Sequence, residues 1–427
     1  LHMDIVKQGL ERNLSISNSL VAMYAKTGLL EEASIVFDAM LVQDVVSWTI
    51  LITGHAESGF VEEAWKSFEQ MQRLGVLPNV VTFLCMLKTC IGIGAIERGR
   101  ALHYDIIKAE VESDSTIGNA LVTMYCNCGS LREAWDVFNE LSVQDVVSWS
   151  AIILGHANHG ENEFSFTLYR TMQEQGLLPN GVTFVSVLTA CSDSASLEAG
   201  RRIHTQMNNS ALLDQTYEVI TSTALIHMYC KCGSIKDAHD MFDAMPRRER
   251  ANWNALITGY SQQGETGVVL NLFEEMRAQT IVPDGVTFLG VLSACSHAGL
   301  VSRGIEYFDV MIEDYNIEPS IRHCNCIIDL LGRAGQLEEA ISRLKSMQVE
   351  PNYVTWNSLL GACKKWGNVE IGREAFECAV KLNEKHDAAY LLMFQIYEDA
   401  HMFEDAKKIE ALRMKFVGKC LNELDFL

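Results

Sequence analysis

The sequence predicts an all-α fold, a right-handed α-solenoid superhelix of tandem helix-turn-helix repeats. The segment "VVSWTILITGHAESG" at residues 45–59 returns as "VVSWSAIILGHANHG" at residues 146–160. The tryptophan of this segment recurs at nearly equal spacing, at Trp48, Trp149, Trp253 and Trp356. Because a catalytic motif is normally needed once, a segment that recurs along the chain is typical of a scaffold.

Each interval between these tryptophans divides into three units, and the division extends over the whole chain. The predicted units are 14–44, 45–79, 80–114, 115–145, 146–180, 181–218, 219–249, 250–284, 285–320, 321–352, 353–386 and 387–420. Residues 1–13 are interpreted as the end of a truncated repeat and residues 421–427 as a tail. We therefore expect the chain to begin inside a longer protein, with any targeting segment outside it.

Every unit is predicted to hold two helices joined by a tight turn. In residues 45–79, "VSWTILITGHAE" is an apolar-faced helix and "GFVEEAWKSFEQMQRLG" contains a second one. The fifteenth position of ten units is glycine, which tolerates a left-handed backbone at the turn. Ala195 and His401 take that place in the other two units, so we expect looser or differently capped turns there. Acidic pairs such as Glu62 and Glu63 then open the second helix, where the helix dipole favours them.

No such hairpin can bury its apolar face alone, so stacked neighbours must share one continuous core. We expect the first helices to line the concave side. Hydrophobic residues make up 48% of the chain and only 6 residues are prolines, which argues against disorder. No apolar run reaches the roughly 18 residues that a membrane span needs. Of the 13 cysteines, four recur in one context and are expected to be buried thiols in a reducing compartment: Cys90, Cys191, Cys295 and Cys363.

Hairpins of this length are typical of both tetratricopeptide and pentatricopeptide repeats, and the amino-acid sequences of the units distinguish between the two. "VVSWTILI", "VVSWSAII" and "RANWNALI" resemble the P repeats of plant PLS-class pentatricopeptide repeat proteins. "SNSLVAMYAKTG", "GNALVTMYCNCG" and "STALIHMYCKCG" resemble their S repeats, and "VTFVSVLTACS" and "VTFLGVLSACSHAG" their L repeats. "CIIDLLGRAGQLEEA" resembles the last S-type repeat, so units 14–352 would be P, L and S repeats. Residues 353–386 then resemble the first E motif, and residues 387–420 more weakly the second.

This resemblance implies a sequence-specific protein that binds single-stranded RNA, with each repeat docking one base in the 5′ to 3′ direction. Residue 5 of a repeat and its last residue would contact the pairing edge of the base, and residue 2 would form an apolar wall between bases. Asparagine followed by aspartate resembles the uracil type, at Asn18 with Asp44, Asn119 with Asp145, and Asn254 with Asp284. Threonine or serine followed by asparagine resembles the adenine type, at Thr49 with Asn79 and Ser150 with Asn180.

The remaining repeats give weaker or no base assignments. Asn325 with Asn352 resembles the pyrimidine type, leaning to cytosine, and Thr223 with Glu249 is interpreted as a purine reader. The L repeats carry apolar residues at position 5 and leave their bases unspecified: Leu84, Val185 and Leu289. The predicted site is 5′-UAnUAnRUnY-3′. The expected base-sandwiching residues are Val46, Val81, Val147, Val182, Ile220 and Val286, with Ala251 and Arg322 departing from the apolar pattern.

Each assignment has a structural alternative, because a single asparagine or aspartate at a helix end is usually a cap, and valines at position 2 could simply pack. The base readers are therefore expected to share one continuous accessible track. If they do, the resemblance implies a site-recognition factor for C-to-U editing of transcripts in a mitochondrion or chloroplast. The edited cytidine would lie 3′ of the base assigned to Asn325 and Asn352.

No catalytic site is expected in this chain. The editing deaminase of the family needs H-x-E and P-C-x-x-C elements around a zinc ion. His55-Ala56-Glu57 matches the H-x-E pattern, but the equivalent residues of a related repeat are His156-Ala157-Asn158, which lack the glutamate. The match is therefore interpreted as part of the repeat and not as a zinc site. No C-x-x-C occurs, and the C-x-C pairs point their sulfurs to different sides of a helix. No metal or cofactor is expected. The tail "GKCLNELDFL" departs from the family pattern because no DYW region follows it. Two interpretations remain open: the sequence is truncated before such a region, or a DYW-type deaminase or other editing protein acts in trans.

The formal net charge of −21 favours a different partner. Nucleic-acid binders usually carry a basic footprint. The alternative interpretation is a protein-binding helical-repeat scaffold with an acidic surface; no membrane or DNA partner is expected in either case.

Overall fold

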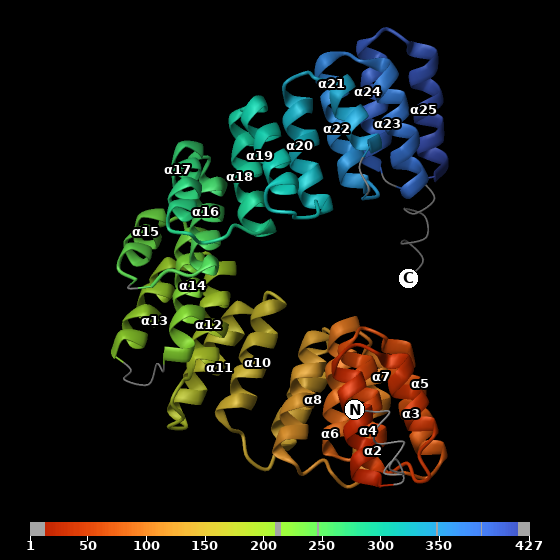
Figure 1. Ribbon diagram of the computed structural model, residues 1–427. Helices are drawn as coiled ribbons and strands as arrows, with labels where there is room; N and C mark the ends of the chain where they lie inside the picture. Colours follow the sequence, from red (N-terminus) through yellow and green to blue (C-terminus); the bar gives the residue numbers. More distant parts are fainter. Residues whose placement is uncertain (1–12, 210–214, 246, 347–348, 386, 417–427) are drawn as a thin grey trace. The chain divides into compact units, whose positions relative to one another are not determined.

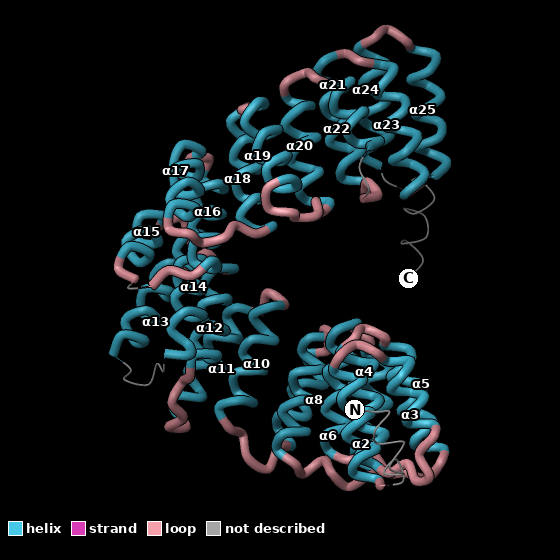
Figure 2. Tube along the Cα trace, in the orientation of Figure 1, coloured by secondary structure: helices cyan, strands magenta, loops and turns pink. Residues whose placement is uncertain are grey.

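The computed structural model describes residues 13–416 apart from 210–214, 246, 347–348 and 386, and it confirms an all-α fold. None of the described residues lies in a strand (Figure 2). The first helices of the hairpins are α2 (Leu14–Lys26), α4 (Val45–Glu57), α6 (Val80–Ile93), α8 (Ser115–Asn127), α10 (Val146–Asn158), α12 (Gly181–Asp193), α14 (Gln215–Lys231), α16 (Arg250–Gln263), α18 (Gly285–Ala298), α20 (Ile321–Arg333), α22 (Tyr353–Trp366) and α24 (Asp387–Asp399). The second helices are α3 (Leu30–Asp38), α5 (Val61–Arg73), α7 (Ile96–Lys108), α9 (Leu131–Glu140), α11 (Asn162–Glu174), α13 (Leu197–Asn209), α15 (Ile235–Asp243), α17 (Thr266–Ala278), α19 (Val301–Glu313), α21 (Leu337–Ser346), α23 (Val369–Leu382) and α25 (Phe403–Phe416).

The helices fall two to each unit expected from the sequence, with one shifted boundary. Helix α14 begins at Gln215, ahead of the expected start of its unit at residue 219. The chain forms two compact units, residues 1–224 and 225–427, and the division falls within α14. Residues 1–12 of the predicted truncated repeat lie outside the described part. So do residues 417–420 of the last predicted unit and the whole predicted tail, residues 421–427.

Within each compact unit, first helices contact first helices of neighbouring hairpins and so form one layer (Figure 1). The series α2, α4, α6, α8, α10 and α12 is continuous in the first unit, and α16, α18, α20, α22 and α24 in the second. Most second helices also pack against the first helix of the next hairpin, for example α9 against α10 and α19 against α20. The core therefore lies between hairpins, which is the packing expected for an α-solenoid.

A repeated aromatic pair links one hairpin to the next. A phenylalanine of the second helix meets the tryptophan of the following first helix edge-on, at centroid distances of 4.6, 4.9 and 4.7 Å: Phe37 with Trp48, Phe138 with Trp149, and Phe242 with Trp253. These tryptophans are almost fully buried. Since a buried aromatic ring contributes a large apolar area, this pair accounts for three of the four recurring tryptophans; the helix before Trp356, α21, contains no phenylalanine.

Glycines inside the first helices let neighbouring first helices approach closely. A Cβ atom added to Gly155 would lie 2.2 Å from Cys126 Sγ, and one added to Gly259 would lie 2.2 Å from Cys230 Sγ. Burial raises the pKa of the Cys126 thiol to about 12, so this cysteine behaves as a small apolar residue. The four cysteines that recur once per long interval are also fully buried free thiols.

The expectation of looser turns at Ala195 and His401 is wrong. Both residues adopt the left-handed backbone, with φ of +49° and +58°, as the glycines of the other turns do. The Ser196 N–H donates to the Cys191 carbonyl at 2.9 Å, just as the Leu29 N–H donates to the Tyr24 carbonyl at 3.0 Å in a glycine turn. The hydrogen bonds of the turn therefore impose this conformation even where the residue has a Cβ atom.

Candidate nucleic-acid interface

The last residue of a predicted repeat is the N-cap of the next first helix. This holds for Asp44, Asn79, Asp145, Asn180, Glu249, Asp284 and Asn352, which cap α4, α6, α10, α12, α16, α18 and α22. The Asp44 carboxylate, for example, accepts from the Ser47 N–H at 2.9 Å. Capping alone therefore explains part of the preference for asparagine and aspartate at these positions.

The structure nevertheless brings three asparagines at position 5 into direct hydrogen bonds with the caps predicted to act with them. The side-chain N–H of Asn254 donates to Asp284 Oδ1 at 3.0 Å. Asn119 donates to both carboxylate oxygens of Asp145 at 3.3 Å, and Asn18 donates to Asp44 Oδ1 at 3.4 Å. Capping does not require these bonds between consecutive hairpins.

At several pairs a threonine at the third position of the next first helix joins the two residues. Thr49 Oγ1 lies 2.7 Å from Thr82 Oγ1, which in turn lies 2.9 Å from Asn79 Oδ1. Ser150, Thr183 and Asn180 repeat this arrangement at 2.7 and 3.0 Å. In the last S-type repeat the Thr355 hydroxyl lies 2.6 Å from Asn325 Oδ1 and 3.0 Å from Asn352 Oδ1. This third residue was not among the predicted site residues, although a serine or threonine at the third helical position ("VSW", "VTF") could have indicated it.

Thr223 and Glu249 belong to different compact units and are described separately. The Thr223 hydroxyl donates to the Val219 carbonyl at 2.7 Å. Glu249 caps α16, and its backbone N–H donates to Asn252 Oδ1 at 2.9 Å.

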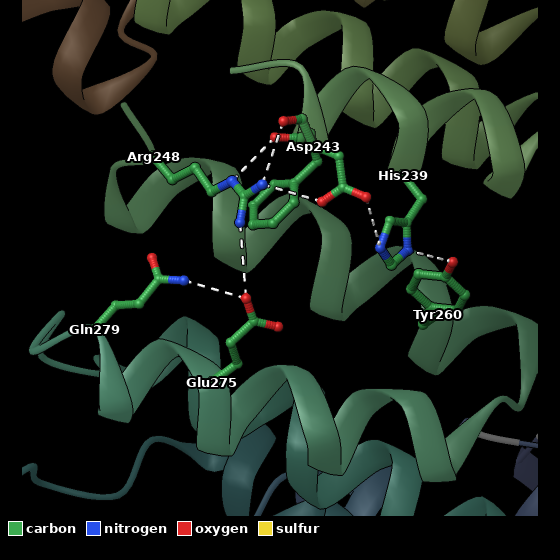
Figure 3. Close-up of polar contacts among 7 residues, drawn as sticks. His239, Asp243, Arg248, Tyr260, Glu275 and Gln279 are labelled. Atoms are coloured by element: carbon green, nitrogen blue, oxygen red, sulfur yellow. Dashed lines mark hydrogen bonds and ion pairs between the residues drawn. The ribbon is translucent and has the colours of Figure 1, made fainter. Parts of the chain in front are cut away.

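The residue before the N-cap anchors the loop that presents it. Figure 3 shows Arg248, which precedes Glu249, directed at Asp243 and Glu275. The Arg248 guanidinium lies 4.5 Å from the centroid of the Phe242 ring. Its Nε donates to the Phe242 carbonyl at 3.1 Å, and its guanidinium reaches Asp243 Oδ1 at 3.0 Å and Glu275 Oε1 at 3.7 Å. Glutamines make the same bond to a phenylalanine carbonyl elsewhere: Gln43 to Phe37 at 3.0 Å and Gln144 to Phe138 at 3.2 Å.

The expected accessible track is only partly present. Asn18, Asn119, Thr223 and Asn325 are half-buried, as are the N-cap residues. Thr49, Ser150 and Asn254 are buried, with exposed fractions of 8%, 2% and 9%, so the expectation of accessibility is wrong for these three. The reason is local: the Thr49 and Ser150 hydroxyls bond to carbonyls of their own helices and to the next helix.

The expected base-sandwiching residues are exposed apolar side chains in every case. Their exposed fractions range from 43% to 58%, at Val46, Val81, Val147, Val182, Ile220 and Val286. One exposed valine needs no explanation, but an exposed valine or isoleucine at the same helical position in six repeats does. Val354, at the same position in residues 353–386, is 45% exposed and was not among the expected residues. Arg322 and Ala251 are exposed as well.

Two of these valines line a cavity together with one predicted reader pair. The cavity has a volume of about 290 Å³ and lies among α8, α10 and α12. Val147, Val182, Ser150 and Asn180 line it, with Asn127 and Asn158 nearby. Its size is at the lower end of pockets that hold small molecules, about 300–1,000 Å³. The half-buried Leu84, Val185 and Leu289 offer no side-chain hydrogen bond at the corresponding places.

The charges separate between the two kinds of helix. Among α2 to α22 the first helices carry more basic than acidic residues, whereas the second helices α3 to α23 carry an excess of acidic ones. Burial would raise the pKa of Asp44, but hydrogen bonds from Ser47 and Asn18 outweigh it and hold that pKa below its usual value. Asp44 is therefore an ionised acceptor at neutral pH. The acidic N-caps Asp44, Asp145, Glu249 and Asp284 lie in the same layer and offset this basic excess. The layer that carries the predicted readers is therefore close to neutral, although the chain as a whole is strongly acidic.

Among the residues that the structure describes, no group of three or more His, Cys, Asp or Glu side chains could hold a metal ion. No described helix combines the length and apolar character that crossing a membrane would take. His55 is half-buried near the end of α4, and burial lowers its pKa.

Comparisons with known proteins agree with this architecture. The model of the PPR repeat family matches residues 43–92, 144–193 and 249–297. The PPR repeat model matches residues 15–45, 119–146, 220–249, 286–315 and 354–383. The pentatricopeptide repeat domain model matches residues 310–365. The chain is 36% identical to pentatricopeptide repeat-containing protein At2g33680 of Arabidopsis thaliana, over 96% of this chain and 56% of that protein. It is 37% identical to the chloroplastic protein At1g11290 of the same plant, over 97% and 51%.

The chain thus spans about half the length of these relatives. Among solved structures it is similar to the maize pentatricopeptide repeat protein PPR10, with a TM-score of 0.66 and 17% identity over 94% of this chain and 64% of that one. PPR10 in complex with an 18-nt psaJ RNA element gives a TM-score of 0.70, also at 17% identity, over 97% and 62%. The repeat models, the identity to plant proteins and the stacked hairpins together show that the chain belongs to the pentatricopeptide repeat family.

Proposed function

We propose that the chain binds single-stranded RNA sequence-specifically, with about one base per repeat, and that its site is 5′-UAnUAnRUnY-3′. One observation carries this proposal: residue 5 and the following N-cap are joined by hydrogen bonds between hairpins, beside exposed apolar residues that recur in register. The cavity between Val147 and Val182 is a place for one base, with Ser150 and Asn180 at its edge.

The donors and acceptors of the pairs support the assigned bases. Asn254 has one side-chain N–H committed to Asp284, so its second N–H can donate to a carbonyl of uracil. The Thr49 hydroxyl donates to the Val45 carbonyl, so its oxygen can only accept from a base. With the Asn79 amide as donor, this pair suits an edge that presents an amino group beside an acceptor nitrogen, as adenine does.

We further propose that this recognition selects sites for C-to-U editing of organelle transcripts, with the deaminase supplied by another protein or another part of this one. Similar proteins of Arabidopsis thaliana are named chloroplastic or mitochondrial, which supports an organelle as the location. The edited cytidine would lie 3′ of the base read by Asn325 and Asn352.

Fluorescence anisotropy with the predicted ten-mer and a scrambled RNA of equal composition tests the binding. The matched variants are Val147→Ala with Val182→Ala, and Val143→Ala as the control, because Val143 is 65% exposed in the loop after α9. Losing about 0.8 kcal/mol of contact at each valine should weaken binding of the ten-mer about tenfold, and the control should not change it. Equal affinity for the two RNAs would overturn the proposal and favour the acidic protein-binding scaffold.

A further inference from the structure

The third residue of a first helix takes two different positions at the reader pairs. Where it is serine, the hydroxyl donates back to the N-cap carbonyl: Ser47 to Asp44 at 2.8 Å and Ser148 to Asp145 at 2.9 Å. Where it is threonine, the hydroxyl lies 2.6–2.7 Å from the polar atom of residue 5, as at Thr82, Thr183, Thr287 and Thr355. The β-branch of threonine restricts χ1 and so favours one hydroxyl direction.

Two reader pairs made of the same two residue types, Asn254 with Asp284 and Asn18 with Asp44, isolate the effect of this third residue. Asn254 is fixed at both ends of its amide, because Nδ2 donates to Asp284 at 3.0 Å and Oδ1 accepts from Thr287 at 2.6 Å. Asn18 is held only at its nitrogen end, by a bond of 3.4 Å to Asp44. Its Oδ1 is buried without a hydrogen-bond partner, because the Ser47 hydroxyl is turned to the cap carbonyl.

This difference changes what the amide can offer to a base. With its oxygen occupied, Asn254 presents only an N–H and suits the carbonyl of uracil. The Asn18 amide has one weak bond of 3.4 Å and no hydroxyl on its oxygen, so it is free to turn and present either its N–H or its oxygen to a base. A base that donates to that oxygen then gains a hydrogen bond. The amino group of cytosine is such a donor, in the place where uracil has a carbonyl.

We propose that the third residue of the following first helix is an additional specificity determinant, with Thr287 positioning Asn254 to require uracil over cytosine at the eighth base. Ser47 and Ser148 then leave the first and fourth bases readable as either pyrimidine. The inference rests on the proposed RNA binding. It adds a residue from the next hairpin to each reader pair.

The test exchanges threonine and serine at two boundaries with identical reader pairs. Ten-mers with uracil or cytosine at the fourth or eighth base are compared for the wild type, Thr287→Ser and Ser148→Thr. The uracil-to-cytosine affinity ratio at the eighth base should fall about three- to tenfold in Thr287→Ser, the effect of one hydrogen bond. The ratio at the fourth base should rise by a similar factor in Ser148→Thr.

Several controls separate positioning from general structure. Thr89→Ser is a matched substitution in α6, where the hydroxyl bonds to the Cys85 carbonyl, and should change no ratio. The adenine preference at the fifth base should stay constant in every variant, and Thr287→Val should reproduce the fall at the eighth base without the hydroxyl. If the wild type does not discriminate between ten-mer and scrambled RNA, the proposed function fails. If it discriminates and Thr287→Ser keeps the wild-type ratio at the eighth base, only this inference fails.

Discussion

The double substitution Thr49→Asn with Asn79→Asp should change the second base of the preferred RNA from adenine to uracil. It places the residues of the Asn254 and Asp284 pair at the α4–α6 boundary. Thr82 already stands at the third position of α6, where Thr287 stands in α18. Thr49 and Asn254 are also equally buried, at 8% and 9% exposed, so the longer side chain has a precedent at this position.

The size of the switch follows from the hydrogen bonds that are exchanged. Two bonds to the base edge change, and each contributes about 0.5–1.5 kcal/mol net. The uracil-to-adenine affinity ratio should therefore rise by about 1–3 kcal/mol, or roughly five- to a hundredfold. The Val45 carbonyl loses the Thr49 hydroxyl, but this carbonyl lies in a helix and keeps its backbone partner, so the fold should change little.

The assay is a competition between ten-mers that differ only at the second base. Each single variant should shift the ratio part of the way, since each supplies half of the pair. Ser150 and Asn180 provide the internal control, because the fifth base should remain adenine. An unchanged preference for adenine at the second base, with a wild-type melting curve, would refute residue 5 as a base reader.

Further predictions concern packing, the turns, pH and salt. Gly155→Ala should lower the free energy of unfolding, measured in urea, by about 1–3 kcal/mol, because its Cβ would meet Cys126. Gly361→Ala, where an added Cβ has nothing within 4 Å, should raise that free energy by about 0.5–1 kcal/mol. Equal effects of the two substitutions would contradict the close helix contact. Ala195→Gly should raise stability by about 0.5–1 kcal/mol by relieving a positive φ, and a lower melting temperature would count against this. Burial holds the pKa of His323 below 6.5, so the contribution of the neutral imidazole to the free energy of unfolding is complete above about pH 6.5. This contribution is lost as the pH falls towards the lowered pKa. The melting temperature of His323→Thr should therefore fall less on acidification than that of the wild type. RNA affinity should fall only shallowly with added salt, and a steep fall would mean that many phosphates are neutralised.

The architecture could be predicted because each hairpin repeats the same local signals. The turn glycines and the recurring tryptophans mark where helices end and where neighbours pack, and both depend on a few adjacent residues. The error at Ala195 and His401 came from treating glycine as a requirement of the turn. The backbone hydrogen bonds of the turn impose the left-handed conformation on these residues too.

The juxtaposition of residue 5 with the next N-cap could also be predicted, because hairpin length fixes which residue caps the next helix; the role of these pairs as base readers stays a prediction. Their burial could not, since it depends on a third residue that the next hairpin supplies. Asn254 and Asn18 look equivalent in the sequence, yet only one has its amide oxygen bonded. Likewise, the balance of charge on the first helices depends on where helices begin and end, which the total of −21 conceals.

Since every N-cap belongs to one repeat by sequence and to the next helix by structure, the unit of folding and the unit of base recognition are out of phase. If residues 45–79 were transplanted as a module, Thr82 would stay behind. Thr49 and Asn79 would then contact the first turn of a helix from the host protein. Engineers who wish to graft a base preference intact should instead cut within the first turns and move residues 48–82 as one cassette.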